Sequence, residues 1–284
     1  MTLTQTGNNE TCLVTAGTGK VGRRIVARLR QQNVSVRIGS RNNDPAFDWH
    51  DRSTWDAALD GVTAAYIAYL PDLVVPGAAE AIEAFVSTAV EKGVQRLVLL
   101  SGRGETEGYR CERIVQDSGV DWTIIRAGWF MQNFTEGDFQ QMICDGAIVL
   151  PARDIPEPFV DVNDIADVAV AALTEEGHSN QLYEVTGPRA MTLMELANEI
   201  SVASRREIPF IRVSMDALTQ ELAAAGTPGD VIELMRYLFG TVLDGRNSTP
   251  GDGVQRALGR APADFRSFAR RAVARGAWKQ SAVA

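Results

Sequence analysis

Short apolar runs alternate with longer patterns of helical period through the first half of the chain. The apolar runs predict strands at 11–15, 34–39, 64–70, 96–101 and 122–126. The helical patterns between them predict helices at 21–31, 77–92 and 110–118. Strands separated by helices with short connections are typical of a parallel sheet that is covered on both faces. The pattern therefore predicts the α/β class, with a doubly wound parallel sheet whose ligands bind beyond the carboxyl ends of the strands.

The second half of the chain is less regular. Short strands are expected at 147–150, 158–162 and 183–186, and helices at 165–173, 192–203, 212–225 and 228–239. Asn163 is expected to cap the first of these helices, and Thr227 before Pro228 is expected to start the last. The last two helices are mostly apolar. They are expected either to form a lid over a cleft or to form a dimer interface.

Three glycines stand where the first predicted strand turns into the first helix, in the pattern Gly17-x-Gly19-x-x-Gly22. One glycine makes the tight turn, one lets the backbone approach a pyrophosphate, and one allows the helix to pack closely on the strand. The helix N-terminus offers N–H groups and a partial positive charge to the phosphates. A Walker-type loop is excluded, because Val14 and Val21 stand where it requires Gly and Ser or Thr. The turn predicts a dinucleotide on a Rossmann-type sheet.

This turn and the ends of the following strands define the expected cofactor site. Residues 10–155 are expected to form a dinucleotide-binding Rossmann core. Residues 156–284 are expected to complete the sheet and to add a smaller substrate-binding or lid region within a single structural unit. The residues expected to contact the cofactor are Gly17, Thr18, Gly19, Lys20, Val21, Gly22, Ser40, Arg41, Tyr69, Leu70, Ser101 and Gly128.

The end of the second predicted strand bears on which dinucleotide is bound. A site for NAD usually places Asp or Glu there, about 20 residues past the glycines, to hold the ribose 2′-hydroxyl. No acidic residue occurs at this point before Asp44. Arg41 supplies a cation for a 2′-phosphate and Ser40 a hydrogen-bond donor, so NADP(H) is expected in preference to NAD(H). The alternative is that Arg41 is an ordinary surface residue in a turn.

Composition excludes several other classes of protein. The net charge is −8, and no basic stripe occurs in the first 250 residues, so no nucleic-acid partner is expected. The basic segment 256–279 has apolar residues at helical spacing and is expected to be a terminal helix with a solvated face. The N-terminus lacks a basic start followed by an apolar stretch, and no apolar run approaches a membrane span. The chain is therefore expected to be cytoplasmic, neither exported nor inserted in a membrane.

The cysteines and histidines give no sign of a metal site or a disulfide framework. Cys12, Cys111 and Cys144 are odd in number and far apart, as expected for reduced thiols. The two histidines, His50 and His178, have no paired Cys or His spacing around them. No metal is therefore expected.

Several segments together resemble the NmrA-like branch of the atypical short-chain dehydrogenases/reductases, over essentially the whole chain. Within that family the chain is most similar to bacterial secondary-metabolite reductases and ergot-alkaloid imine reductases, with angucyclinone (simocyclinone-type) ketoreductases as a narrower match. The resemblance implies a Rossmann-type fold, NAD(P)H-dependent reduction, and nicotinamide and substrate contacts after the fifth strand. The matching segments are 15–22, 99–102, Glu112 with 118–126, 127–134, 159–166 and 183–188.

Two departures from the family pattern concern the glycine turn and the proton donor. The family usually has glycine where Ala16 stands, and Gly17 is expected to compensate for it. No tyrosine of this chain is followed by lysine four residues later, so the usual Tyr-x-x-x-Lys pair is absent. Tyr109 has Arg113 at that spacing, but arginine stays charged and cannot relay a proton.

The missing lysine narrows the expected chemistry. Hydride delivery needs only a nicotinamide held face-on to an electrophile. The proton is expected from water, from Tyr109 or Ser101 as tentative catalytic residues, or from the substrate itself. A substrate that is easily protonated or already cationic is therefore favoured, such as a polycyclic aromatic ketone or an imine.

The substrate contacts are expected from Trp129, Phe130 and Asn133 after the fifth strand and from Tyr237 in the last helix. Trp129 and Phe130 are equally consistent with simple core residues. The function favoured is an NADPH-dependent ketoreductase for a bulky, polyketide-like aromatic natural product, acting as a monomer or homodimer in antibiotic biosynthesis. The alternatives are an imine reductase, a cofactor-sensing regulator without turnover, and a cofactor-retaining isomerase or epimerase.

Overall fold

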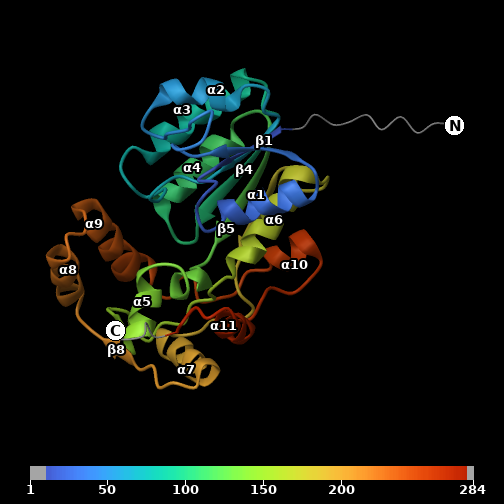
Figure 1. The fold of residues 1–284 in the computed structure, drawn as a ribbon. Helices are drawn as coiled ribbons and strands as arrows, with labels where there is room; N and C mark the ends of the chain where they lie inside the picture. The colour runs from blue at the N-terminus through green and yellow to red at the C-terminus, as the bar shows by residue number, and fades with distance from the viewer. Residues whose placement is uncertain (1–10, 280–284) are drawn as a thin grey trace.

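A six-stranded parallel sheet forms the centre of the protein (Figure 1), whose computed structural model describes residues 11–279. The strand order is β2-β1-β3-β4-β5-β7, and every neighbouring pair is parallel. The doubly wound parallel sheet predicted from the apolar pattern is confirmed. Its strands are β1 (Thr11–Thr15), β2 (Ser35–Gly39), β3 (Ala64–Ile67), β4 (Arg96–Gly102), β5 (Asp121–Ala127) and β7 (Gln181–Val185).

Helices cover both faces of this sheet, because successive strand residues point to opposite sides. Val14 and Val98 face a core that they share with α1 (Gly22–Gln31) and α6 (Val162–Thr174). The neighbouring Leu13 and Leu97 face the opposite core. That core is completed by α2 (Trp55–Leu59), which follows the short turn η1 (Arg52–Thr54), and by α3 (Ala78–Glu91) and α4 (Thr106–Gln116).

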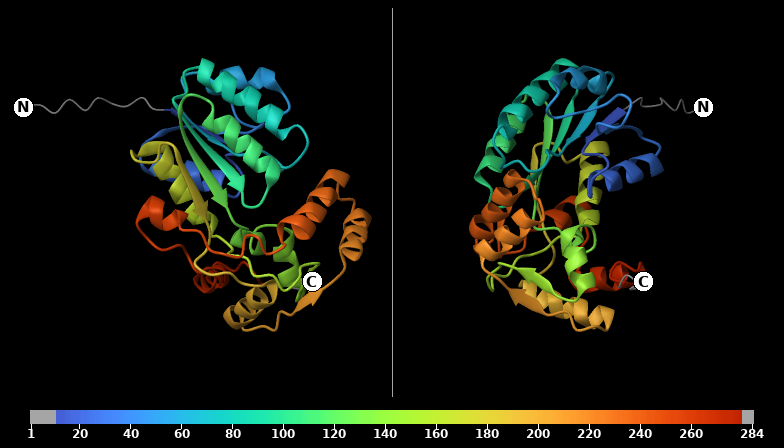
Figure 2. Two further views of the ribbon diagram at one scale, coloured as in Figure 1. Left: turned by 180° about the vertical axis from the view of Figure 1, so that it is seen from behind. Right: turned by 60° about the vertical axis from the view of Figure 1, so that its left-hand side comes forward.

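A second lobe lies beyond the carboxyl ends of the strands (Figure 1). Its small parallel sheet pairs β6 (Ile148–Leu150) with β8 (Phe210–Arg212). The turn η2 (Met131–Phe134) and the helices α5 (Asp138–Asp145), α7 (Leu193–Ser204) and α11 (Phe265–Ala274) share one apolar core with this sheet. Figure 2 shows α8 (Met215–Ala224) and α9 (Gly229–Tyr237), in orange, as an arm beside the lobe; the π-helical turn η3 (Leu238–Val242) continues from α9. The helix α10 (Gly253–Leu258) returns to pack against β7 and α6.

The segment before α6 differs from its sequence prediction. No strand forms over 158–162, where Val160 makes only an isolated bridge with Phe130. The reason is that Pro158 has no N–H to donate and the partner segment curls into η2 after Phe130. The predicted cap is also wrong: Asp161, not Asn163, caps α6 by accepting a hydrogen bond from the Asn163 backbone N–H at 2.9 Å.

Later elements show further differences. The prediction that Thr227 starts α9 is wrong, because Pro228 precedes the helix and no side chain caps it. The first residue of the helix predicted at 212–225 belongs to β8, and α5 and the short α2 lie in segments where no helix was predicted. The segment predicted as one terminal helix at 256–279 instead contains the end of α10 and, after a break, α11. The basic helix α11 forms, but its polar face is not wholly solvated, since Arg271 pairs with the buried Asp161 at 2.7 Å.

Among residues 11–279, no helix combines the length and apolar character needed to cross a membrane.

Gly17 was predicted to compensate for the alanine at position 16 of the strand-to-helix turn, but the backbone of the turn is different. Ala16 itself adopts a left-handed conformation with φ of 48°, and Gly17 does not. Gly17 instead supplies space, because a Cβ there would lie 2.8 Å from both Val14 O and Ile38 Cγ2. Gly22 supplies space as well: a Cβ on it would overlap Ala16 O and lie 2.8 Å from Gly17 Cα. The close packing of α1 on β1 thus depends on Gly22.

We expect Gly22→Ala to destabilise the protein by about 1–3 kcal/mol, since the new methyl group meets backbone atoms that cannot rotate away. The measurement is the free energy of unfolding in urea. The matched control is Gly229→Ala at the start of α9, where a Cβ would meet nothing within 4 Å. That control is expected to leave stability unchanged or to raise it slightly. Equal losses in the two variants would contradict the packing role of Gly22.

Candidate functional site

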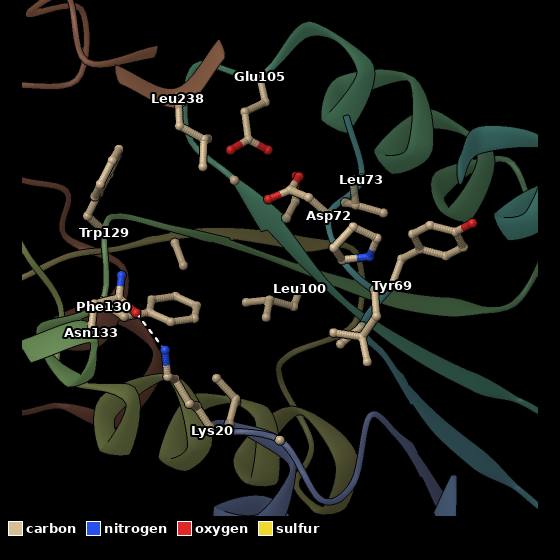
Figure 3. Close-up of a pocket in the computed structure, with 18 of the residues that line it drawn as sticks. Lys20, Tyr69, Asp72, Leu73, Leu100, Glu105, Trp129, Phe130, Asn133 and Leu238 are labelled. Carbon is tan, nitrogen blue, oxygen red and sulfur yellow. Dashed lines mark hydrogen bonds between the residues drawn. The ribbon is translucent and has the colours of Figure 1, made fainter. Parts of the chain in front are cut away.

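A cavity of about 410 Å³ opens beyond the carboxyl ends of β3, β4 and β5 (Figure 3). The glycine turn before α1 contributes one part of its wall, the three strand ends contribute a second, and the segment from α9 into η3 contributes a third. Of the residues predicted for the site, the following line this cavity: Gly19, Lys20, Val21, Gly22, Tyr69, Leu70, Ser101, Gly128, Trp129, Phe130 and Asn133.

The glycine turn fits the pyrophosphate of a dinucleotide. The N-terminus of α1 lies in the cavity wall, and no side chain caps it. Its backbone N–H groups and the positive end of its dipole are therefore available to an anion. A Cβ on Gly19 would lie 3.2 Å from Ala16 O, so a larger residue would crowd this cradle. Lys20 extends along the cavity and donates a hydrogen bond to Asn133 Oδ1 at 2.8 Å (Figure 3).

Four of the predicted cofactor contacts lie around this turn without lining the cavity. Gly17 is buried beneath it and donates its N–H to Gly39 O at 3.3 Å, whereas Thr18 is exposed. Ser40 and Arg41 follow β2 directly, and β2 ends beside Thr15 of β1. Arg41 is exposed, and nothing among residues 11–279 forms a hydrogen bond or ion pair with its guanidinium. These two side chains are therefore placed at the outer edge of the turn.

The end of β3 is braced by aromatic packing. Tyr69 lies with its ring 5.1 Å from that of Trp49, and Trp49 donates from Nε1 to Ala68 O at 3.1 Å. Leu70, the next residue, leaves 55% of its surface exposed and lines the cavity. The strand end thus offers an apolar edge to a ligand.

Neither residue proposed as a proton donor from the sequence presents a free hydroxyl to the cavity. Ser101 lines it, but its hydroxyl donates to Glu112 Oε1 at 2.7 Å. Glu112 is paired in turn with Arg126, whose guanidinium lies 4.4 Å from the centre of the Tyr109 ring. Tyr109 does not line the cavity, and its hydroxyl accepts a hydrogen bond from the Gly104 N–H at 3.0 Å.

The predicted substrate contacts divide into two groups. Trp129, Phe130 and Asn133 line the cavity, and Trp129 also packs edge-on against Phe239 with ring centres 5.1 Å apart. Trp129 and Phe130 are partly buried against the cores, so each is both a wall residue and a core residue. Tyr237 lies outside the cavity wall, with its hydroxyl at the backbone of Thr106; burial, chiefly, raises its pKa. Its neighbours Met235, Leu238 and Val242 form the wall instead.

Sequence reasoning missed a pair of carboxyl groups at this site, those of Asp72 and Glu105. Both line the cavity, and Figure 3 shows them turned toward one another. Burial, followed by the charges of Asp72 and Glu112, raises the pKa of Glu105 to about 8. Burial also raises the pKa of Asp72, against the hydrogen bonds it accepts from the backbone of Val74 and Leu73. Because both residues closely follow a strand end, extending the search a few residues past each strand would have found them.

A third carboxyl group, that of Glu157, lies in the cavity wall close to Arg103. Glu157 is 1% exposed, and neither of its carboxyl oxygens has a hydrogen-bond partner in the described chain. Burial raises its pKa to about 7, and the charge of Arg103 opposes this rise. The Arg103 guanidinium is itself held by Asn247 O at 2.9 Å and by Glu184 at 3.0 Å. Glu157 lies in irregular chain, where no sequence pattern marks it.

Together these groups make a mostly apolar cavity with proton-holding carboxyls beside an anion-binding turn. Such a site can hold a dinucleotide across the strand ends and a flat apolar molecule against Leu70, Trp129 and Leu238. Glu105, with a pKa of about 8, is mostly protonated at neutral pH and can act as a hydrogen-bond donor, and Glu157, with a pKa of about 7, is protonated in part.

Comparisons with known proteins agree with this geometry. A family model described as NAD(P)H-binding matches residues 16–176. The chain is 28% identical to the NAD(P)H azoreductase of Xenophilus azovorans over 280 residues, which cover 91% of this chain and 96% of the relative. It is 29% identical to the agroclavine dehydrogenase of Claviceps fusiformis over 279 residues, again 91% and 96% of the two chains.

A solved structure has the same fold. The triphenylmethane reductase of Citrobacter sp., in complex with NADP(H), superposes with a TM-score of 0.75 at 20% identity, covering 92% of this chain and 99% of that one. The matched family model spans more than half of the chain and includes the glycine turn. The chain therefore belongs to the NAD(P)H-binding family, and oxidoreductases are among its relatives.

Proposed function

We propose that this protein is an NADPH-dependent reductase of a carbonyl group on a bulky aromatic compound. The observation that carries the proposal is the shared cavity: the dinucleotide turn and an apolar aromatic wall line the same space. Residues far apart in sequence, Gly19 in the turn and Leu238 after α9, face the same ligand volume. A sensor of the cofactor alone has no use for this second wall, so the enzyme is favoured over a regulator.

The chain's own residues would perform three tasks in this reaction. The turn at 16–22 binds the pyrophosphate, and the ends of β4 and β5 orient the nicotinamide against the substrate. The bound dinucleotide supplies a hydride. Trp129, Phe130 and Leu238 exclude water and hold an aromatic ring system, because apolar surface is released from water on binding. The buried carboxyls are among the groups in the wall that can hold a proton.

The names of the relatives support an aromatic substrate. An azoreductase and a triphenylmethane reductase are named for aromatic dyes, and agroclavine dehydrogenase is named for an alkaloid. We accordingly propose a polyketide-like aromatic ketone of secondary metabolism, such as antibiotic biosynthesis, as the substrate. The kinship to agroclavine dehydrogenase favours an imine as the second candidate.

The proposal is tested by following reduced-nicotinamide absorbance with NADPH and a panel of acceptors. The panel contains phenanthrenequinone and tetralone as carbonyl acceptors and dihydroisoquinoline as an imine. We expect turnover of a carbonyl acceptor, because the cavity is apolar and its carboxyls are hydrogen-bond donors. Turnover of the imine alone would shift the assignment to an imine reductase. Tight NADPH binding with no turnover of any acceptor would contradict the proposal and favour a sensor.

The preference for NADPH is proposed to depend on Arg41. Its exposed guanidinium beside the turn is available to pair with a 2′-phosphate. Loss of such a charge-assisted contact costs about 1.5–3 kcal/mol, or roughly 10- to 100-fold in Kd. Arg41→Ala is therefore expected to weaken NADPH binding by that factor and to leave NADH binding nearly unchanged, as measured by nicotinamide fluorescence.

The matched control for this change is Arg30→Ala, which removes another exposed arginine, at the C-terminal end of α1. It is expected to alter neither Kd. If Arg41→Ala weakened the binding of NADPH and NADH equally, Arg41 would not be the residue that distinguishes the 2′-phosphate.

Tyr109 is expected to be dispensable for proton transfer. Its hydroxyl accepts from Gly104 and lies outside the cavity wall, while its ring packs under Arg126. Tyr109→Phe keeps the ring and should retain most of kcat for the best acceptor of the panel. A fall of about 1,000-fold, the size expected when a general acid is removed, would restore Tyr109 as the donor.

A further inference from the structure

Glu105 occupies a place that two glycines make available. It is the last of the three residues between β4 and α4, directly before the helix, but its side chain does not cap the helix. The carboxyl folds back onto the end of β4 instead, where a Cβ on Gly102 would overlap it. A Cβ on Gly108 would lie 3.4 Å from Glu105 Cβ and 3.2 Å from Ser101 Oγ. The absence of a side chain at residue 102 therefore makes room for the Glu105 carboxyl at the strand end, and Gly108 packs closely beside it.

The carboxyl of Glu105 has no internal partner. It is 7% exposed, lines the cavity, and makes no side-chain hydrogen bond with any residue from 11 to 279. Other polar groups nearby are already engaged: Ser101 with Glu112, and Glu112 with Arg126. A buried carboxyl with no donor around it is far more stable with its proton than without it. The protonated carboxyl of Glu105 thus lies in the wall of the cavity that would hold the ligand.

The charges around Glu105 keep that proton in place. Asp72 faces it from the segment between β3 and α3, Glu112 from α4 and Tyr237 from the end of α9. Arg246 is also near, donating to Gly104 O at 3.3 Å, but its guanidinium is paired with Asp244 at 2.6 Å. Glu112 is neutralised by Arg126, whereas no ion pair with Asp72 occurs in the described chain. Asp72 is therefore the charge that opposes ionisation of Glu105.

We propose that Glu105 is the proton donor of the reduction, with Asp72 as the positioning residue that keeps it protonated. This inference rests on the proposed function. The carbonyl carbon gains a hydride at the expense of the reduced nicotinamide dinucleotide, which is oxidised. The O–H bond of Glu105 breaks, a new O–H bond forms on the carbonyl oxygen, and the Glu105 carboxylate then regains a proton from solvent. The pair fills the role left open by the absent Tyr-x-x-x-Lys.

The test compares two acceptors that differ in their need for a proton. Phenanthrenequinone takes up a hydride and a proton, whereas the crystal violet cation becomes neutral on accepting a hydride alone. Glu105→Gln in the NADPH-loaded enzyme is expected to lower kcat for phenanthrenequinone by about 100-fold or more, the usual size for loss of a general acid. Reduction of crystal violet should be nearly unchanged. The control, Glu107→Gln, alters an exposed carboxyl on α4 and should affect neither reaction.

The outcomes separate a chemical role from a structural one. Equal losses with both acceptors, or no loss with either, would overturn the inference. Reduction of crystal violet alone by the wild type would overturn it too, since no protonated carbonyl product is then formed. If only phenanthrenequinone is reduced, the dependence of kcat on pH tests the donor role, and kcat should fall above about pH 8 as Glu105 loses its proton. Asp72→Asn removes a negative charge beside Glu105, so the fall in kcat should begin at a lower pH in that variant. If kcat falls at the same pH in Asp72→Asn as in the wild type, Asp72 does not have the positioning role.

A second readout does not require turnover. In infrared difference spectra, a protonated-carboxyl component should titrate near pH 8 and be missing from Glu105→Gln, whereas the component of Glu157, with a pKa of about 7, should remain in that variant. Loss of the Glu105 component at the ordinary pKa of glutamate, about 4.3, would overturn the inference even in an active reductase. Silence with every acceptor, by contrast, would reject the proposed function, and the donor role with it, whatever the spectra show.

Discussion

The ion pair between Glu112 and Arg126 joins α4 to β5, and the arrangement of the candidate site depends on it. Glu112 is 2% exposed, so loss of Arg126 would leave its buried carboxylate without an ion pair, at a cost of about 3–5 kcal/mol. The pair also accepts the Ser101 hydroxyl and supports the Tyr109 ring. The Tyr109 hydroxyl accepts from the Gly104 N–H outside the cavity wall. The carboxyls of Asp72, Glu105 and Glu157 remain in the cavity wall.

The cavity brings together parts of the chain that have different physical tasks. The turn before α1 attracts an anion through a helix N-terminus and a close backbone approach, and its form is set by contacts within a few residues. The opposite wall, with Trp129, Met235 and Leu238, is apolar and depends on the packing of the second lobe. Between them lie Asp72, Glu105 and Glu157, whose pKa values are all raised by burial. This order of anion site, proton-holding groups and apolar wall fits hydride transfer to an aromatic acceptor.

The sheet, its helices and the glycine turn were predictable, because each follows from a local regularity. Strands and helices were read from the spacing of apolar residues, and the turn was read from three glycines between them. Errors arose where local signals competed. Asn163 is a good capping residue, but Asp161 lies two residues earlier and reaches its N–H. The apolar run before it could not form a strand beside a segment that curls into η2. Left-handed Ala16 was missed because alanine rarely adopts positive φ, and only the surrounding packing imposes it here.

By itself the sequence determined the fold class, the place of the dinucleotide turn, the residues at the strand ends and the absence of a Tyr-x-x-x-Lys pair. These properties depend on neighbours along the chain. The tertiary structure decided which of those residues share a cavity, that Ser101 is bound to Glu112, and that Tyr109 and Tyr237 lie outside the wall. It also brought Asp72 and Glu105 face to face from two different strand ends. The protonation of such a pair depends on burial and on charges brought together by folding, and no spacing in the sequence records either.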